Sequence, residues 1–461
     1  MAIHVTGSFF PLLLSFFLSA AGRTEVSPRI TDADSPKVLE IDLNVVRPLC
    51  AEGVPDEVPA LRAALWKLLL GYLPCDAFRW DSALEVGRAA HAEFLQELIA
   101  ELTVTSEGAE GSRRRARSYS HEESDSSDPM AEAAASEGLE EVLDQIRKDT
   151  FRTRPELDFF CRGLAPSSAS TNVASGESSC WWQGGRKEEG PRRNGVQPSE
   201  PEMAVTSRDP DEVDVVNPKS HYDCLARVLL LYAKLNPGVR YVQGMNELCA
   251  PLYFLFAQDP LNYEYAEADT FFCFSHLMSD MRDAFVKTLD HTEGGMMGRI
   301  DKFSDLLREK DAEVWQHLES IKVCPVYYTV RWLTLMLAQE LDMPDVLRLW
   351  DALLSDRARP HPLLRYMCVA MVICVREVLL AGDFTDCMRL LQHYPPVPVD
   401  DILQVAFRLR ALDLTQVGFS SSDLEAAAGG AGEAAAFAAA AAVAAANAAS
   451  SRTAGSWWQW R

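Results

Sequence analysis

The sequence predicts an all-α fold, and three observations support this. Apolar residues recur at helical spacing nearly everywhere from Val58 to Arg410. No segment in this range keeps the alternation of apolar and polar residues, bounded by turn residues, that is typical of a surface strand. The chain of 461 residues is 48% hydrophobic and 24% charged, which is a globular composition with enough apolar material for one large domain or two medium ones.

Start and stop signals place individual helices. One helix is expected from about Lys219 to Leu235, because Pro218 precedes it and the turn-forming run Asn236–Gly238 follows it. The next helix begins after the loop 239–244 and directs its apolar residues toward a core. The stretch Tyr366–Val375 is apolar on every face and has an arginine at each side. Because ten residues are too few to cross a membrane, this stretch predicts a central buried helix.

Two low-complexity segments interrupt the helical pattern. Residues 105–137 join a basic run to a run rich in Ser, Asp and Glu, and residues 165–212 are rich in Ser, Gly, Pro, Arg and Glu. Neither segment has enough apolar residues to fold alone, so both are expected to be disordered insertions. The folded domain is expected over residues 37–410, followed by an Ala-rich low-complexity tail over residues 411–461.

The first 36 residues form an apolar, leader-like segment. Phe9–Ala21 is an apolar run that ends in small residues, as in the core of a signal peptide, and it is too short to span a bilayer as a helix. No Lys or Arg precedes it, and the chain has no Asn-x-Ser/Thr sequon. These features favour a mis-assigned start, a loose apolar tail or a weak membrane contact, and secretion remains the alternative.

Charge and cysteine content narrow the class of protein. The formal net charge of −23 repels a polyanion, so nucleic acid is not an expected partner. The cysteines number eleven, no pair has Cys-x-x-Cys spacing, and no histidine completes a zinc-ligand pattern, so no metal site is expected. Most lie in apolar surroundings and are expected to be reduced, buried thiols of a cytoplasmic protein. The examples are Cys273, Cys324, Cys368 and Cys374.

The chain carries no self-contained catalytic motif. It has no phosphate-binding Gly-x4-Gly-Lys-Ser/Thr loop, no Gly-x-Gly-x-x-Gly, no His-Glu-x-x-His and no Gly-x-Ser-x-Gly. The glycines 294, 295 and 298 are better explained as a turn than as a phosphate cradle. The sequence therefore does not indicate an enzyme with its own cofactor.

Two short polar segments stand out from the helical background. In the segment Ile146–Thr153, Asp149 and Arg152 are three residues apart and share a helix face, although such a pair is most often a surface ion pair. In the segment Tyr241–Glu247, Gln243 precedes a glycine at the start of a helix, where backbone and amide can both approach a ligand. The alternative for this second segment is a simple capping loop.

Together these segments resemble the TBC domain of Rab GTPase-activating proteins. The first segment matches the family motif Ile-x-x-Asp-x-x-Arg and the second matches Tyr-x-Gln-Gly-Met-Asn-Glu, both without a mismatch. Leu61–Gly71, with Arg62 and Trp66, looks like the opening Arg-x-x-x-Trp segment, and the later signatures are similar to 331–333 and 344–351. The resemblance covers roughly residues 58–410 without the insertions, and it implies a two-lobed, multi-helix TBC domain.

The resemblance also implies a function and a set of site residues. The chain would stimulate GTP hydrolysis by a GTP-bound Rab, as an activator rather than an enzyme with its own substrate, with Arg152 and Gln243 as catalytic fingers supplied in trans. Mg²⁺ and GTP would arrive with the GTPase, so no cofactor is expected, and any peripheral membrane association would come through the partner. The implied supporting residues are Asp149, Tyr241, Gly244, Asn246, Glu247, Arg62 and Trp66.

The supporting residues receive specific expectations. Asp149 is expected to orient an arginine through a charge-assisted pair, and the residues around Gln243 to fix the glutamine loop or line the GTPase contact. Trp66, Trp332 and Trp350 are expected to be core anchors rather than contacts. Arg62 lies one turn from Trp66 and could serve either purpose.

Two other functions remain compatible with the sequence. A TBC-fold adaptor that binds a GTPase or another trafficking partner without catalysis is the alternative from a different class, and inactive family members typically lack one of the two fingers. A helical scaffold unrelated to GTPases predicts an internal repeat of some 30 to 50 residues, and none is found.

Overall fold

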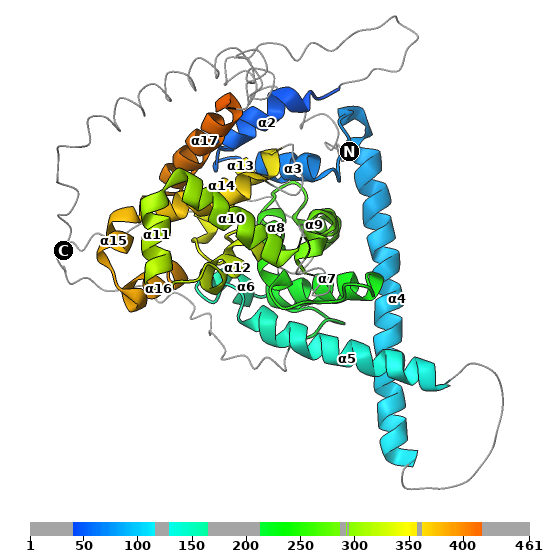
Figure 1. Cartoon of the computed structure of the whole chain (residues 1–461). Coiled ribbons are helices and arrows are strands. Elements are labelled where there is room, and N and C mark those ends of the chain that lie inside the picture. Colours follow the sequence, from blue (N-terminus) through cyan, green and yellow to red (C-terminus); the bar gives the residue numbers. More distant parts are fainter. Residues whose placement is uncertain are drawn as a thin grey trace, which may run out of the picture.

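The computed structural model of the chain describes residues 40–115, 129–164, 213–285, 292, 295–356 and 362–416. In these ranges the chain forms helices joined by turns, with two isolated bridges and no strand, which confirms the all-α prediction (Figure 1). The leader-like segment 1–36, the second insertion 165–212 and the Ala-rich run lie outside the described residues.

The first half of the domain holds the helices that carry the two polar segments. In chain order the elements are α2 (Leu43–Glu52), α3 (Pro59–Leu70), η1 (Ala77–Arg79), α4 (Trp80–Arg115), α5 (Pro129–Phe151), α6 (Asp158–Cys161), α7 (His221–Leu235), α8 (Met245–Ala257), η3 (Tyr263–Tyr265), α9 (Ala266–Met281) and η4 (Arg282–Ala284).

The second half of the domain continues the helical array. Its elements are α10 (Met296–Lys310), α11 (Ala312–Ser320), α12 (Val326–Thr334), α13 (Met343–Ser355), α14 (Pro362–Cys374), α15 (Arg376–Ala381), α16 (Phe384–Gln392) and α17 (Val399–Gln416). The last helix therefore extends six residues past the predicted domain end at 410.

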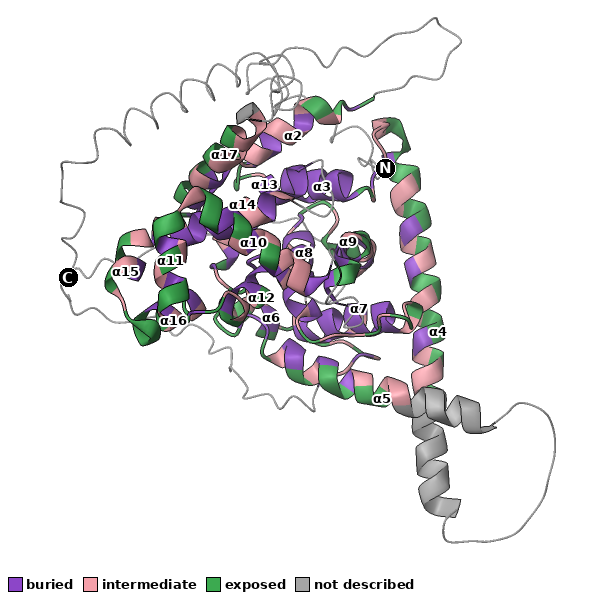
Figure 2. Cartoon of the chain, in the orientation of Figure 1, coloured by how far each residue is buried: buried purple, intermediate pink, exposed green. Residues whose placement is uncertain are grey.

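The centre of the domain is built from α3, α7, α8 and α9, which pack against one another. Figure 2 shows α3, α7 and α8 buried along most of their length. The start of α7 is fixed by a capping box, in which the side chains of Ser220 and Asp223 each accept from the backbone N–H of the other. The helix begins at His221, two residues after the predicted start, and ends at Leu235 as predicted.

The apolar stretch in the second half is a buried helix, as predicted. It belongs to α14, which packs against α17 and α10 and begins at Pro362, earlier than the predicted Tyr366. Most of its residues from Leu363 to Val372 are buried. Burial on nearly all faces explains why this helix has no polar stripe.

Buried ion pairs tie α3 to its neighbours. Lys67 of α3 bonds to the carboxylate of Asp269 in α9, and Nη2 of Arg88 in α4 lies 2.9 Å from the same carboxylate. Removing one partner of such a group leaves a buried charge uncompensated, which is strongly destabilising. These charges therefore fix the relative placement of three helices.

The first insertion differs from the disordered segment that its composition predicts at both ends. Helix α4 continues through residues 105–115, and residues 129–137 form the beginning of α5; residues 116–128 lie outside the described part. Figure 1 shows the end of α4 extending beyond the other helices. Residues 129–137 include several Ala and Glu residues, which have high helix propensity, so a helix forms there without a full apolar face.

The cysteine prediction is confirmed in part. The ten cysteines in the described residues are all free thiols, and Cys273 and Cys368 are buried. Cys324 is exposed and Cys374 only half-buried, so for these two the prediction is wrong. Cys324 lies in the loop between α11 and α12, where Val323 turns into the core and its neighbour turns outward.

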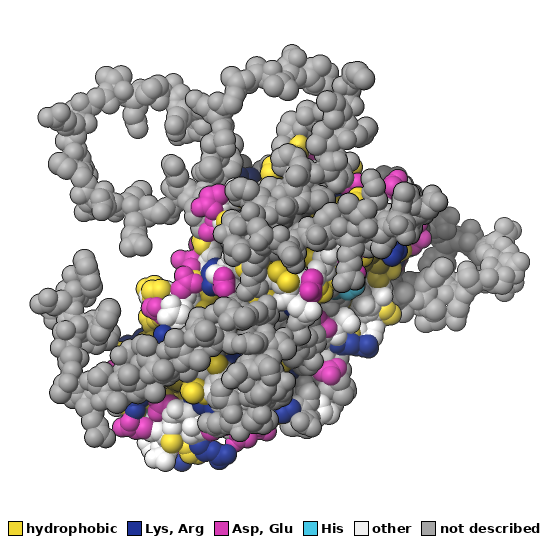
Figure 3. All heavy atoms as spheres, turned by 90° about the horizontal axis from the view of Figure 1, so that it is seen from above, with side chains coloured by type: hydrophobic (Ala, Val, Ile, Leu, Met, Phe, Trp, Pro, Cys, Tyr) yellow, Lys and Arg dark blue, Asp and Glu magenta, His cyan; other side chains and the backbone are white. Residues whose placement is uncertain are grey.

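None of the described helices is both long enough and apolar enough to cross a bilayer. Across the same residues, no group of three or more His, Cys, Asp or Glu side chains is arranged to hold a metal ion. Figure 3 shows acidic and basic side chains side by side on the described part of one face, with apolar side chains between them. The described surface on this side is therefore mixed in charge rather than a field of one sign.

Candidate functional site

Arg152 lies in the turn directly after α5, which ends at Phe151. Its backbone N–H donates to the carbonyl of Asp149 at 3.1 Å, and the next N–H, of Thr153, donates to the carbonyl of Thr150 at 3.0 Å. The Arg152 side chain is exposed, and it makes no hydrogen bond or ion pair within the described part of the chain. The turn is thus held by its backbone while the guanidinium stays available.

Gln243 lies in the turn directly before α8. Its side chain is also exposed and forms no hydrogen bond among the described residues. The next residue, Gly244, caps the helix with a φ of 105°, a conformation that favours glycine. A Cβ at this position would lie 2.9 Å from Cδ2 of Leu335, so any other residue would also have to displace this side chain.

A group of polar side chains binds the two turns to each other. The Tyr241 hydroxyl donates to the Asp149 carboxylate at 3.0 Å, across 92 positions of sequence, and lies 3.1 Å from Oδ1 of Asn246. Nδ2 of Asn246 donates to the hydroxyl of Thr153 at 2.8 Å, and its Oδ1 accepts from the N–H of Gly244 at 3.2 Å. We call Asp149, Thr153, Tyr241 and Asn246 the polar clamp.

Tyr241 contributes the hydroxyl group of the polar clamp, and its surroundings keep that hydroxyl protonated. Burial and the neighbouring Asp149 carboxylate raise the pKa of Tyr241, so its hydroxyl remains a donor at neutral pH. Asp149 itself is almost fully buried, and its carboxylate also accepts from Nε2 of Gln145 at 2.8 Å. Tyr241 therefore supplies the donor of the hydrogen bond that joins the two turns.

The expected partner of Asp149 is not an arginine. Its carboxylate bonds to Tyr241 and Gln145, whereas Arg152 is exposed beyond the end of the helix. The spacing of three residues would place Asp149 and Arg152 on one face only if the helix continued, and α5 ends at Phe151. Asp149 thus supports the glutamine loop through Tyr241.

Glu247 lies in the first turn of α8 and is buried. Burial raises the pKa of its carboxyl, and a hydrogen bond from Gln339 and the nearby Arg154 partly oppose this effect. Nε of Arg154 is 3.9 Å from the Glu247 carboxylate. Glu247 therefore supports the start of α8 from inside the domain and is not exposed for a direct contact with a partner protein.

Arg62 and Trp66 belong to the core and not to the two turns. Nε of Arg62 and the indole N–H of Trp66 donate to the Asp351 carboxylate at 3.1 and 2.7 Å. Burial raises the pKa of Asp351, and Arg62 opposes the rise. The rings of Trp66 and Trp350 stack with centroids 5.7 Å apart, and Trp332 is fully buried as well, which confirms all three tryptophans as core anchors.

Three structural features of the site had no signal in the sequence. Thr153 belongs to the polar clamp, and its carbonyl also accepts from the hydroxyl of Tyr222 at 3.0 Å. Arg154, two residues after Arg152, has a φ of 50° and a buried side chain. The turn between α12 and α13 packs against both polar segments although it has no motif of its own.

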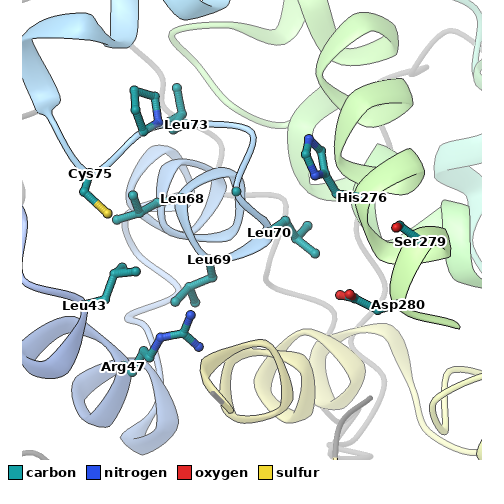
Figure 4. Close-up of a pocket in the computed structure, with 12 residues that line it drawn as sticks. Leu43, Arg47, Leu68, Leu69, Leu70, Leu73, Cys75, His276, Ser279 and Asp280 are labelled. Carbon is teal, nitrogen blue, oxygen red and sulfur yellow. The ribbon is translucent and has the colours of Figure 1, made fainter. Parts of the chain in front are cut away.

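A groove of about 380 Å³ lies away from these two turns. Residues of α2, the end of α3 and α9 line it, and Figure 4 shows Arg47, Leu69 and Asp280 among them. None of the predicted catalytic or supporting residues lines it. The groove is therefore a feature separate from the polar clamp.

Comparison with known proteins identifies the family. A family model described as the Rab-GTPase-TBC domain matches residues 206–380. TBC1 domain family member 13 of Homo sapiens is 37% identical over 402 residues, which cover 83% of this chain and 98% of that protein. The chain belongs to the TBC-domain family of Rab GTPase-activating proteins. A TBC domain-containing protein of Schizosaccharomyces pombe is 31% identical over 80% of this chain and 70% of its own length.

A solved structure supports the TBC fold. The crystal structure of the Ypt/Rab-GAP domain of Gyp1p aligns with a TM-score of 0.53 at 20% identity, covering 80% of this chain and 92% of that domain. The family-model match includes Gln243 and begins after Arg152, and the insertion 165–212 lies between these two residues in the sequence. In the TBC domain described here, the polar clamp brings these separated segments together.

Proposed function

We propose that this TBC protein accelerates GTP hydrolysis by a GTP-bound Rab-family GTPase, with Arg152 and Gln243 supplied in trans. The observation that carries the proposal is the pair of exposed side chains on two turns that are bonded directly to each other. Each side chain is without a hydrogen-bond partner in the described residues, and each turn is held by buried groups. This arrangement is typical of groups kept available for a ligand.

Arg152 suits the charge that develops in phosphoryl transfer. In the transition state, negative charge spreads over the oxygens of the γ-phosphoryl and leaving groups. A guanidinium is always charged and offers forked N–H donors that match these oxygens, whereas lysine presents only a point charge. Arg152 would stabilise the transition state, with an expected effect on the rate of ~10³- to 10⁵-fold.

Gln243 suits the attacking water. Its amide has both donors and an acceptor, so one side chain can donate to the γ-phosphate and accept a hydrogen bond from water. We propose that Gln243 takes the role of the GTPase's own glutamine. The GTPase brings Mg²⁺ and the nucleotide, so the chain needs no cofactor of its own in this mechanism.

Single-turnover GTP hydrolysis across a panel of purified Rabs tests the proposal. Wild type should accelerate at least one Rab, and Arg152→Ala should lower the maximal acceleration by ~10³-fold or more. Arg152→Lys should recover little, because it lacks the fork. Gln243→Ala should also abolish most of the acceleration.

Matched controls replace residues of the same type away from the clamp. Arg389→Ala on α16 and Gln96→Ala on α4 change exposed side chains and should leave the rate unchanged. If no Rab is accelerated although some still bind, the protein is an adaptor and the proposal is wrong. If acceleration survives both finger substitutions, catalysis lies elsewhere in the chain.

A further inference from the structure

The turn between α12 and α13 has an unusual backbone. Met336 and Leu337 are consecutive non-glycine residues with φ values of 49° and 62°, and both are buried. Left-handed backbone is sterically unfavourable for a residue with a side chain, because the Cβ crowds the following carbonyl oxygen, so the surroundings must impose this conformation. The carbonyl of Met336 accepts from the indole N–H of Trp350 at 3.2 Å, which fixes the turn to the buried core.

Arg154 joins this turn to the arginine segment. Its side chain is only 6% exposed, Nη1 donates to the carbonyl of Leu341 at 2.8 Å, and Nη2 donates to the carbonyl of Ala338. The backbone of Arg154 has a φ of 50°, so it too is in the left-handed region. The planar guanidinium places two N–H groups at a fixed spacing, one for each carbonyl, whereas a lysine ammonium is a single point charge that does not reproduce this spacing. Arg154 follows Arg152 by two residues, so this contact anchors the backbone next to Arg152.

The same turn supports the glutamine segment. Leu335 packs under Gly244, where a Cβ would meet its Cδ2 at 2.9 Å. Glu247, in the first turn of α8, lies 3.9 Å from Nε of Arg154 and receives a hydrogen bond from Gln339. Both finger-bearing segments therefore rest on one short stretch of chain, residues 335–341.

We propose that the turn 335–341 is a positioning element that holds Arg152 and Gln243 at a fixed distance and orientation to each other. Leu335 in the turn and Arg154, which binds the turn, are the positioning residues. The inference rests on the proposed function, because it concerns how the two side chains meet one nucleotide. Neither positioning residue touches the nucleotide. The polar clamp holds the two turns to each other, and the turn 335–341 anchors that pair to the core through Trp350.

The test substitutes Arg154 by lysine in the full-length protein. Arg154→Lys keeps the charge and loses the fork, so it should lower the maximal single-turnover rate by roughly 10- to 100-fold, as expected for misplaced catalytic groups. The concentration giving half-maximal acceleration should change by less than about threefold, because GTPase-contacting side chains are kept. If Arg154 only stabilises the fold, the two quantities should change the other way round. Part of the protein would be unfolded, so the concentration giving half-maximal acceleration would rise while the maximal rate stayed the same.

Two further variants keep the test decisive. Leu335→Ala removes the packing under Gly244 and should give the same loss of maximal rate. Arg227→Lys is the matched control: Arg227 is a half-buried arginine that forks onto Glu267 at 2.8 and 2.5 Å on α7 and α9, away from the fingers. Its maximal rate should equal that of wild type. An unchanged maximal rate in both Arg154→Lys and Leu335→Ala would overturn the proposal.

Amide hydrogen exchange separates this inference from the proposed function. Arg154→Lys should speed exchange at the N–H groups of Thr153 and Gly244 together, and leave α14 unchanged. If wild type accelerates no Rab, the proposed function fails, and the positioning role is judged on exchange alone. Faster exchange in only one of the two turns, or in neither, would contradict a shared positioning element.

Discussion

At the scale of single residues, the site consists of exposed side chains available to a partner and buried side chains that hold the turns. Arg152 and Gln243 are exposed and carry the proposed chemistry, whereas Tyr241, Asn246 and Asp149 are buried or half-buried and hold the turns. A buried polar group that loses its partner costs free energy, whereas an exposed side chain is replaced at little cost to stability. Substitutions in the two groups should therefore affect different measurements.

Asn246→Ala should destabilise the domain. The change removes the acceptor for the N–H of Gly244 and the donor to the Thr153 hydroxyl, so the free energy of unfolding should fall by ~1–3 kcal/mol. Urea unfolding followed by circular dichroism measures the change. Asn236→Ala, which removes one bond to the carbonyl of Tyr232 at a helix end, should cost less. Equal losses would show that the polar clamp is not the stronger contact.

The motifs named Asp149, Tyr241 and Asn246 among the supporting residues, but they gave no role to Thr153 or Arg154. Arg152 and Gln243 lie in turns at helix ends. Each belongs to a short contiguous motif, so a sequence match alone was enough to single it out. The prediction that Asp149 pairs with an arginine was wrong, because α5 ends at Phe151 and Asp149 instead bonds to Tyr241 and Gln145. Arg154 was missed because no local pattern signals a non-glycine residue with positive φ, and its partners are 184 and 187 positions away.

At the scale of elements, α6 and α7 meet in an aromatic cluster around His221. Its ring stacks on Phe159 with centroids 4.2 Å apart, and Nδ1 lies 2.8 Å from the hydroxyl of Tyr253. Burial, with the nearby Arg162, lowers the pKa of His221 to about 4. The sequence predicted α7 to within two residues from its proline and turn signals, but not this packing, which joins segments separated by the insertion 165–212.

The lowered pKa of His221 predicts a pH dependence. The folded state keeps the ring neutral down to about pH 4, whereas the unfolded chain takes up a proton below about 6.5. The contribution of His221 to stability is therefore fully present above pH 6.5 and decreases as the pH falls from 6.5 to 4. His221→Phe keeps the stack and removes the titration.

Chemical unfolding of both proteins at several pH values checks this prediction. Because all other titrating groups are shared, the difference between wild type and His221→Phe isolates the histidine. That difference should shift in favour of the variant as the pH falls from 6.5 to 4. A difference that stays constant over this range would contradict a neutral, half-buried His221.

At the scale of the whole molecule, the described residues on both sides of the insertion 165–212 are bonded to the start of α7. Before it, the N–H of Leu164 donates to the carbonyl of Lys219 at 2.9 Å. After it, the N–H of Asp214 donates to the carboxylate of Asp223 at 3.2 Å. Composition predicted an insertion here, but the contacts of the residues that flank it come from the structure alone.

Replacing residues 165–212 by a linker of about eight Gly and Ser residues should leave the domain folded. Each halving of loop length changes the closure free energy by only about 0.6 kcal/mol, and in the stabilising direction. The melting temperature should therefore stay the same or rise slightly, and the acceleration of a Rab should be kept. A lower melting temperature or a lost acceleration would show that the insertion contributes contacts to the domain.

The central claim is that Arg152 and Gln243 complete the GTPase's active site in trans. The most direct measurement is the maximal single-turnover rate on a Rab that responds to wild type, and on the same Rab with its own catalytic glutamine replaced by leucine. Wild type should still accelerate the leucine variant, whereas Gln243→Ala and Arg152→Ala should not. Failure of wild type to accelerate the leucine variant, with full activity on the unmodified Rab, would contradict the role assigned to Gln243.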